Sequence, residues 1–293
     1  MKFHFLVTLS DNVRHLFGIR FICSFFSNLA EDCQVTMLHI HSTGRNDMKG
    51  VLGNMWMRPA DDEYSRLTVQ AKRAIGKSKD LLLDKDIPRE NIYTKACAEH
   101  YGKIEDILKE ALMGQYDAIT LGRRASYSLQ WLFENQADET AQAVIKRLCS
   151  IPVWICPEIE PIRKNMLLCL DGSDSSFRAA DHVGYILASE PSQAITLFHV
   201  ASSDGDNSLP IFKHAESILL YHGVNGDRIN WLVGKGHNIA RVIGEEVNKG
   251  RYAAAALGLH GMQEHSMRAK GLTGRTITKL IRKIERAAIW CCP

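Results

Sequence analysis

Long apolar runs are missing from this chain of 293 residues, and no stretch reaches the roughly 18 consecutive apolar residues that cross a membrane. A dominant charge is missing too, because 36 Lys and Arg residues oppose 33 Asp and Glu residues and leave a net charge of +3. So small an excess does not favour binding to nucleic acid or to a membrane. The start of the chain is apolar after Lys2, but Asp11 and Arg14 follow soon, so we expect a buried strand rather than a signal peptide.

Cysteine spacings typical of metal sites or secreted disulfide frameworks are also absent. None of the eight cysteines forms a C-x-x-C pair, and most lie inside apolar runs, where a thiol behaves as a small core residue. This usage fits a reducing compartment, so we expect a cytoplasmic protein. The adjacent Cys291 and Cys292 allow two interpretations, a redox-active pair or the end of a core strand, and we favour the strand.

What the chain does contain is an internal repeat at an offset of 136 positions. Residues 116–122 (YDAITLG) align with 252–258 (YAAAALG), and residues 153–157 (VWICP) align with 289–293 (IWCCP), with no gap between the two matches. A repeat of this length indicates two copies of one structural unit. The chain is long enough for two domains, and its 45% of apolar residues is typical of globular proteins.

Within each copy, short apolar runs alternate with amphipathic segments, such as Ile239, Val242, Ile243 and Val247 at helical spacing. The runs do not alternate with polar residues, which is typical of strands buried on both faces. This order predicts an α/β protein of two tandem Rossmann-like domains, each a five-stranded, parallel, doubly wound sheet flanked by helices. The expected strands are 3–9, 33–41, 91–97, 117–122 and 151–156 in the first copy, and 166–170, 194–200, 228–233, 252–258 and 288–292 in the second.

The predicted domains are residues 1–157 and 164–293, joined by a polar linker that contains two prolines (PEIEPIRK, 157–164). Residues 36–40 match 196–200 at an offset of 160, whereas Ile104 matches Ile239 at 135. The first copy therefore carries 25 more residues between its second and third strands, and we expect a loop there followed by a long helix from about Asp61.

Candidate site residues in the second copy follow three of its expected strands or precede its last helix. In a doubly wound sheet, ligands bind beyond the carboxyl ends of the strands. Glycines allow backbone N–H groups to approach phosphate oxygens, and a helix amino terminus adds unpaired donors. The alternative is that Asp171-Gly172-Ser173 is an ordinary helix start and that each glycine is only a turn. The segments are Leu170-Asp171-Gly172-Ser173, Leu257-Gly258-Leu259-His260-Gly261 and Gly271-Leu272-Thr273-Gly274-Arg275-Thr276.

This arrangement resembles the universal stress protein family, whose nucleotide-binding members carry G-x-x-G, nine residues, then G-[ST]. Gly258-Leu259-His260-Gly261 matches the first part of that motif, Asp171 matches the aspartate after strand one, and His199-Val200 matches the H-V of strand two. The resemblance covers both copies and implies binding of ATP or AMP, with Mg²⁺ as the accompanying ion. It places Asp171 and Val200 beside the adenosine, and the glycine segments with Arg275 and Thr276 beside the phosphates.

The second part of the motif departs from the pattern. Nine residues after Gly261 comes Gly271, but Leu272 follows it instead of Ser or Thr. Alignment from the last strand points instead to Gly274, with Arg275 and Thr276 after it. Both glycines remain candidates, and Gly274 is preferred because the adjoining helix dipole attracts anions.

The first copy has lost most of these residues, so we expect it not to bind a nucleoside triphosphate in the usual pose. Two carboxylates would face the phosphates, and like charges at about 4 Å repel by about 1 kcal/mol even in water. Its predicted role is structural, pairing with the second copy inside the chain as two single-domain relatives pair in a dimer, and a homodimer of the whole chain is a further expectation. Relative to Gly261, Gly271, Gly274 and Arg275, the first copy has Ala125, Asn135, Asp138 and Glu139.

Three functions remain open on the sequence alone. The first is a regulatory nucleotide-binding protein of the stress response, the second a scaffold that binds no nucleotide, and the third an enzyme that hydrolyses ATP slowly. No catalytic residues are assigned, because there is no P-loop, no paired carboxylates and no nucleophile with a base. No metal site is assigned either, since His4, His39 and His41 have no completing cysteine or carboxylate pattern.

Overall fold

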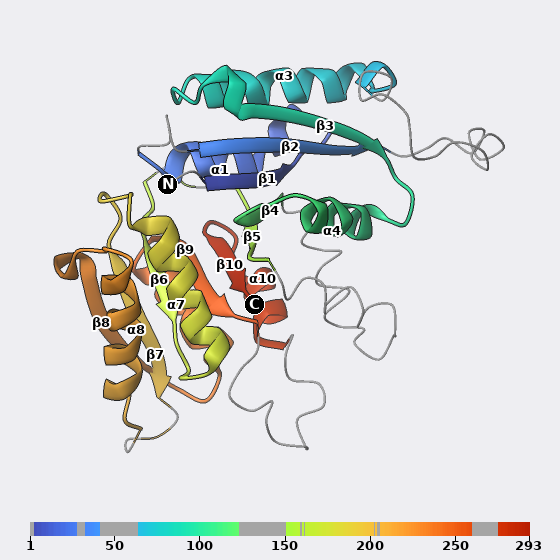
Figure 1. The fold of residues 1–293 in the computed structure, drawn as a ribbon. Helices are drawn as coiled ribbons and strands as arrows, with labels where there is room; N and C mark the ends of the chain where they lie inside the picture. The colour runs from blue at the N-terminus through green and yellow to red at the C-terminus, as the bar shows by residue number, and fades with distance from the viewer. Residues whose placement is uncertain are drawn as a thin grey trace.

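The computed structural model describes residues 3–27, 33–41, 64–122, 151–158, 160, 162–201, 203, 206–259 and 275–293. Strands and helices alternate along these residues, and the strands form one ten-stranded sheet with helices on both faces (Figure 1). The mixed α/β fold class expected from the sequence is therefore confirmed.

The first half of the chain contributes β1 (Phe3–Thr8), α1 (Phe17–Phe25), β2 (Cys33–His41), α3 (Val69–Leu83), β3 (Ile92–Ala98), α4 (Lys103–Met113), β4 (Ala118–Gly122) and β5 (Val153–Cys156), with short 3₁₀ helices η1 (Val13–His15) and η3 (Arg89–Asn91). The second half contributes β6 (Lys164–Cys169), α7 (Asp174–Leu187), β7 (Ile195–Ala201), α8 (Leu209–Tyr221), η4 (Gly226–Arg228), β8 (Ile229–Lys235), α9 (Ile239–Lys249), β9 (Tyr252–Gly258), α10 (Arg275–Lys283) and β10 (Ala288–Cys292).

The order of strands across the sheet is β3-β2-β1-β4-β5-β10-β9-β6-β7-β8. Read inward from either edge, the two halves have the same order, and neighbouring strands within each half are parallel. Among the strands of the described residues, only β5 and β10 pair antiparallel, with Trp154 opposite Trp290. The two tryptophans that the repeat equates thus face each other at the centre of the sheet.

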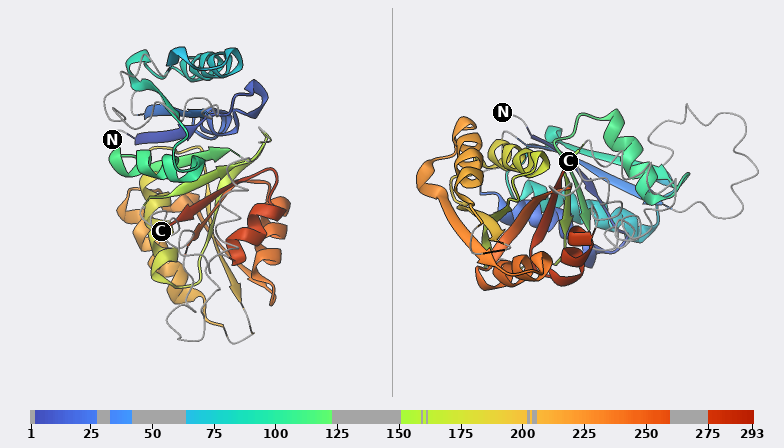
Figure 2. Two further views of the ribbon diagram at one scale, coloured as in Figure 1. Left: turned by 90° about the vertical axis from the view of Figure 1, so that its right-hand side faces the viewer. Right: turned by 90° about the horizontal axis from the view of Figure 1, so that it is seen from below.

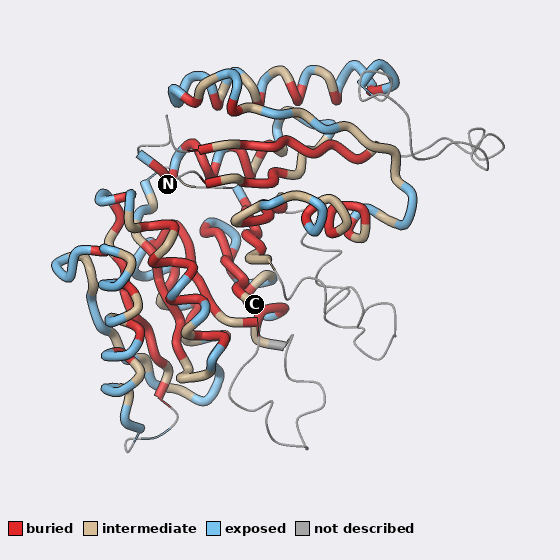
Figure 3. The backbone as a smooth tube through the Cα atoms, viewed as in Figure 1, coloured by how far each residue is buried: buried red, intermediate tan, exposed pale blue. Residues whose placement is uncertain are grey.

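The helices cover the sheet in two layers, because each strand presents alternate residues to opposite faces. One apolar cluster joins residues of α1, α3, α7 and α8 to one face of the sheet. A second cluster joins α4, α9 and α10 to the other face. Seen from below, α7 and α10 lie on opposite sides of β9 and β10 (Figure 2). The central strands are buried along their length, whereas the edge strands β3 and β8 are partly exposed (Figure 3).

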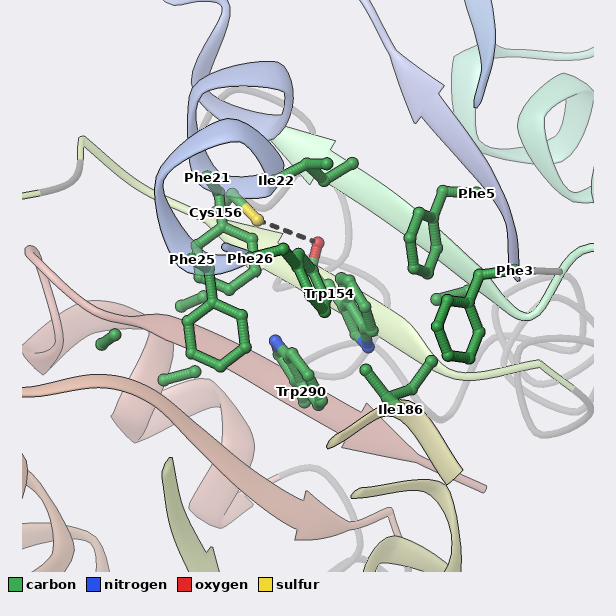
Figure 4. Packing of buried hydrophobic residues seen from close by; sticks show 14 of the residues in the cluster. Phe3, Phe5, Phe21, Ile22, Phe25, Phe26, Trp154, Cys156, Ile186 and Trp290 are labelled. Atoms are coloured by element: carbon green, nitrogen blue, oxygen red, sulfur yellow. Dashed lines mark hydrogen bonds between the residues drawn. The ribbon is translucent and has the colours of Figure 1, made fainter. Parts of the chain in front are cut away.

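The centre of the molecule is an aromatic core where the two halves meet. The rings of Trp154 and Trp290 are stacked with centroids 4.0 Å apart and planes within 6°. Phe21 and Phe25 of α1 pack against them edge-on (Figure 4). Buried aromatic rings remove large apolar areas from water, so this cluster contributes strongly to the association of the two halves.

His182 of α7 lies against both indole rings of this core. Its Nε2 accepts a hydrogen bond from Trp154 Nε1 at 3.1 Å, so the imidazole must be neutral at that nitrogen. Burial lowers the pKa of His182 to about 3. The ring therefore acts as an uncharged acceptor in the core over the physiological pH range.

Polar contacts also join the two halves at the edge of the aromatic core. The buried carboxylate of Glu190 accepts hydrogen bonds from Ser27 N at 2.7 Å and from the Ser27 hydroxyl. Tyr185 donates from its hydroxyl to Asp117 at 3.0 Å, and Gln193 Nε2 donates to the Phe25 carbonyl at 2.8 Å. These bonds connect residues more than sixty positions apart in sequence.

Some local expectations need correction. A helix was expected from about Asp61; residues 61–63 lie outside the described residues, residues 64 and 65 are helical, and after a turn α3 begins at Val69, where Thr68 accepts a hydrogen bond from Ala71 N and caps it. Strand β8 was expected to be buried on both faces, but it lies at an edge of the sheet and Trp231 is 40% exposed.

The adjacent Cys291 and Cys292 are both buried in β10 and carry free thiols. Burial raises the pKa of Cys291 to about 12 and that of Cys292 well above its ordinary value. Because the thiolate is the reactive form, this burial favours the core-strand interpretation over a redox-active pair.

Candidate functional site

The described candidate residues that follow β6, β7 and β9 lie at the carboxyl-terminal ends of these strands, which we call the carboxyl edge. The three strands are neighbours in the sheet. Leu170 follows β6 directly, and its N–H donates to the Phe198 carbonyl of β7 at 2.8 Å. His199 Nδ1 donates to the Leu170 carbonyl at 2.8 Å. Gly258 ends β9, which pairs with β6 on its other side. The structure therefore brings Leu170, Asp171, Val200 and Gly258 to one edge, at the point where the strand order reverses.

The turn after β6 has a geometry set by its sequence. Gly172 adopts a positive φ of 83°, which a glycine tolerates without steric cost. Asp171 Oδ1 accepts hydrogen bonds from Ser173 N at 3.0 Å and from Ser173 Oγ at 2.6 Å. Ser173 in turn caps α7 by accepting from Ser176 N at 3.2 Å. These bonds hold the Asp171 carboxylate in a fixed position at the amino terminus of α7.

Gly258 allows the close approach of α7 to the end of β9. A Cβ atom at this position would lie 2.4 Å from Ser175 Oγ, 2.6 Å from Ser175 C and 2.8 Å from Ser175 O. Such distances are far shorter than van der Waals contact, so position 258 requires glycine. The backbone of β9 and the first turn of α7 therefore meet beside the Asp171 turn.

The candidate residues differ in how far their side chains are buried. Leu170, Leu257 and Leu259 are buried, so their side chains belong to the core and only their backbone can face a ligand. Val200 and Thr276 are half-buried, and Thr276 lies in the first turn of α10. The residues His260, Gly261, Gly271 and Gly274, together with the side chain of Arg275, lie outside the described residues.

His199 connects the ends of β6 and β7. It is 7% exposed, and besides its bond to the Leu170 carbonyl its Nε2 lies 3.3 Å from Asp206 Oδ2. A histidine with a partner on each nitrogen is held in one orientation. His199 thus positions the strand ends, and Val200 follows it on β7.

A cavity lies at the equivalent edge of the first half, where the sequence indicated a degenerate site. Its volume is about 290 Å³, and it is lined by residues from the ends of β1, β2 and β4, from η1 and α1, and from the first turns of α4. The residues are Thr8, Leu9, Ser10, Asp11, His15, Phe17, Leu38, His39, Ile40, Lys103, Ile104, Ile107 and Gly122.

Sequence reasoning assigned no role to this cavity. The available signal was the turn after β1, because Ser10, Asp11 and Asn12 stand where the second copy has Asp171, Gly172 and Ser173. This turn contains no glycine, a regular helix begins at Phe17, and the 3₁₀ helix η1 takes the place of the first turn of α7. The retained Gly122 completes the wall of the cavity.

Within the described residues, no three His, Cys, Asp or Glu side chains are grouped so as to hold a metal ion. In the same part of the chain, no helix is both long enough and apolar enough to cross a membrane.

Comparison with solved structures identifies the fold. A universal stress protein from Archaeoglobus fulgidus DSM 4304 matches over 99% of this chain and 95% of its own, with a TM-score of 0.59 and 14% identity. A functionally unknown protein from Pseudomonas aeruginosa PAO1 matches over 99% and 92%, with a TM-score of 0.53 and 10% identity. A universal stress protein in complex with cAMP matches over 44% of this chain and 96% of its own, with a TM-score of 0.35 and 18% identity.

No protein-family model matches the sequence, and no curated protein matches it significantly. The chain has the fold of universal stress proteins over its whole length. At this level of identity the likeness concerns the fold, and the function has to be argued from the site.

Proposed function

We propose that this chain is a tandem universal stress protein whose second domain, residues 164–293, binds an adenine nucleotide, ATP or AMP. In this proposal the first domain, residues 1–157, pairs with the second and holds no nucleoside triphosphate. The protein acts by binding: occupancy of the second domain changes the surface that a partner protein recognises during the stress response.

The observation that carries the proposal is the convergence of the Asp171 turn and Gly258 at the switch point of the second half-sheet. Both are fixed by contacts of their own, the carboxylate by Ser173 and the glycine by the close approach of Ser175. A site whose groups are already in position loses less entropy when a ligand binds.

The described residues fit an adenine nucleotide in their chemistry. The Asp171 carboxylate retains lone pairs that can accept from ribose hydroxyls or from a base amine. Thr276 places a hydroxyl in the first turn of α10, and the amino terminus of that helix points to the same edge as the end of β10. A helix amino terminus of this kind attracts phosphate oxygens. With the nucleotide, Mg²⁺ would neutralise part of the phosphate charge.

The residues expected to contact the phosphates are those carried over by resemblance, namely Gly258, His260, Gly261, Gly271, Gly274, Arg275 and Thr276. Between the two alternatives, Gly274 is proposed as the phosphate-binding glycine because the sequence places it directly before α10. The corresponding residues of the first domain are Asp138 and Glu139, whose charges repel phosphate.

Calorimetric titration of the full chain with ATP and with AMP, each with Mg²⁺, tests the proposal. The decisive variant combines Gly274→Asp and Arg275→Glu, which introduces the residues of the first domain. Lys249→Glu, at the carboxyl-terminal end of α9 and hence at the opposite edge of the sheet, is the control for the change in charge.

We expect binding to the wild type and to Lys249→Glu, and a loss of at least tenfold in affinity in the double variant, because one favourable charge becomes unfavourable and a second unfavourable charge is added. Absence of binding to the wild type would contradict the proposal and favour a scaffold that needs no nucleotide. Unchanged affinity in the double variant would show that the phosphates lie elsewhere.

A further inference from the structure

The two halves differ in where the helix after their first strand begins. In the second half, α7 begins at Asp174 and Ser175 contacts Gly258. In the first half, α1 begins only at Phe17, after η1. A Cβ atom on Gly122 would find its nearest neighbours at 3.8 and 3.9 Å, which is ordinary contact. The first turn of α7 thus lies against the end of β9, whereas the end of β4, which lines the cavity, has no such close contact with a described residue.

One side of this cavity is positively charged. Lys103, the first residue of α4, lines the cavity and is exposed, and the described residues offer it no ion-pair partner. The amino terminus of α4 has no side-chain cap, since its N-cap residue is Gly102. At the equivalent helix of the second half, Asn238 caps α9 by accepting from Arg241 N at 3.1 Å. The first half therefore offers a free cation and uncapped N–H groups where the second offers a neutral cap.

The acidic residues of the same helix turn do not cancel this charge inside the cavity. Asp106 is 8% exposed and accepts hydrogen bonds from His100 N at 2.8 Å and Tyr101 N at 3.4 Å, outside the helix. Glu105 lines a separate surface hollow with Lys109 and Tyr101, away from the cavity. Lys103 is thus the charged residue that α4 presents to the cavity.

Two histidines and one carboxylate form the polar part of the other wall. His39, which is 2% exposed, pairs through Nε2 with Asp11 Oδ1 at 2.6 Å. Its Nδ1 is buried and finds no hydrogen-bond partner among the described residues, and the same is true of His15 Nδ1. Buried polar atoms without partners are uncommon in folded proteins, and a bound polar group is one way to satisfy them. The counterpart of His39, His199, has a partner on both nitrogens.

The remaining wall is apolar, formed mainly by Leu38, Ile40, Ile104 and Ile107. The cavity's volume of about 290 Å³ lies near the lower end of the range of about 300 to 1,000 Å³ that is typical of small-molecule pockets. An apolar body with a single charged group matches this lining.

We propose that the first-half cavity binds a small organic anion, with its single anionic group beside Lys103 and the amino terminus of α4 and its apolar body against Ile104 and Ile107. The ligand class is an aryl or alkyl carboxylate or phosphate monoester. This site is separate from the nucleotide site proposed for the second domain, and its occupancy does not depend on that proposal.

Fluorine NMR of the full chain tests the proposal with three probes of one shape: para-fluorobenzoate, para-fluorophenyl phosphate and the neutral para-fluorobenzamide. We expect saturable binding of at least one anion in the millimolar range, as befits so small a ligand. Benzamide should bind at least fivefold more weakly than benzoate if benzoate is bound. A preference between the two anions identifies the anionic group.

The variant Lys103→Asn introduces the residue of the second half and should weaken binding of the anion about five- to tenfold, as expected for loss of one charged contact. Lys109→Ala, on the same helix but away from the cavity, is the matched control and should bind as the wild type does. Ile107→Trp, which fills the cavity, should abolish binding. The double variant Gly274→Asp, Arg275→Glu should bind the anion normally, which separates this site from the nucleotide site.

Absence of saturable binding of both anions would overturn the proposal, and so would equal affinity for the anions and benzamide. An equal loss in Lys103→Asn and Lys109→Ala would also overturn it, because the charge would then act from the surface and not from the cavity.

Discussion

Gly258 and Gly122 occupy equivalent positions in the two copies, and the structure predicts opposite responses to the same substitution. In Gly258→Ala the new Cβ would lie 2.4 to 2.8 Å from three atoms of Ser175, two of them in the backbone. Carbon atoms in contact prefer about 3.5 to 4.0 Å, so the first turn of α7 must move by about 1 Å. Overpacking of this kind costs about 1 to 3 kcal/mol of unfolding free energy.

In Gly122→Ala the nearest atoms lie at 3.8 and 3.9 Å, so nothing has to move. Neither glycine has a positive φ, and a Gly→Ala change at a compatible position stabilises by about 0.4 to 1 kcal/mol through the unfolded state. The two variants should therefore differ by about 2 kcal/mol or more in unfolding free energy.

Urea unfolding followed by circular dichroism measures this difference. For slopes of about 2 to 3 kcal/mol per molar urea, the midpoint of Gly258→Ala should lie about 0.7 to 1 M below that of Gly122→Ala. Equal midpoints would refute the reasoning, because they would mean that α7 does not press on the end of β9. The nucleotide affinity of Gly258→Ala should fall as well, since the Asp171 turn moves with α7.

Three further predictions concern the core and the junction between the halves. Because burial lowers the pKa of His182 to about 3 from an ordinary value near 6.5, the unfolded state takes up a proton first as the pH falls. The free energy of unfolding should therefore fall by about 1.4 kcal/mol for each pH unit between pH 6.5 and about pH 3. His182→Gln, which keeps an acceptor for Trp154, should flatten that slope in urea titrations. Glu190→Ala leaves Ser27 N without its partner and should lower the free energy of unfolding by about 1 to 3 kcal/mol, measured as a urea midpoint, whereas an unchanged midpoint would contradict the structural role. Cys291 should not react with a thiol reagent at pH 8 until the protein is unfolded, since burial raises its pKa to about 12; rapid reaction of the native protein would contradict its burial.

The bounds of a strand could be predicted from sequence where an apolar run ends at a glycine or at the end of the chain. The bounds of β9 and β10 agree with the expected 252–258 and 288–292, because one run ends at Gly258 and the other near the carboxyl terminus. The exposure of β8 could not be predicted, since a strand's place at the edge of a sheet depends on which strands pair. The antiparallel pairing of β5 with β10 is a tertiary choice of the same kind, although the two tryptophans of the repeat mark it.

Some features of the candidate site could likewise be predicted from the sequence, and others could not. The sequence placed Asp171, Val200 and Gly258 at one edge, and the structure places them there because parallel strands end together. What the sequence did not reveal is that Gly258 is required by Ser175, since that contact joins two elements far apart in the chain. The cavity of the first half was missed for a related reason: it is lined by residues from several elements that are far apart in the chain.

The domain boundary at residues 157–164 and the loss of triphosphate binding in the first domain stay predictions. The structure adds a physical basis for asymmetry, because the equivalent edges of the two halves differ in shape as well as in sequence. At one edge the first turn of α7 closely approaches Gly258, and at the other a cavity has Lys103 on its wall.

The number of ATP molecules bound per chain tests the central claim most directly. Calorimetry of the full chain with ATP and Mg²⁺ should give a stoichiometry of one, and the double variant Gly274→Asp, Arg275→Glu should remove that single event. A stoichiometry of two, or binding that survives in the double variant, would contradict the assignment of the nucleotide to the second domain alone.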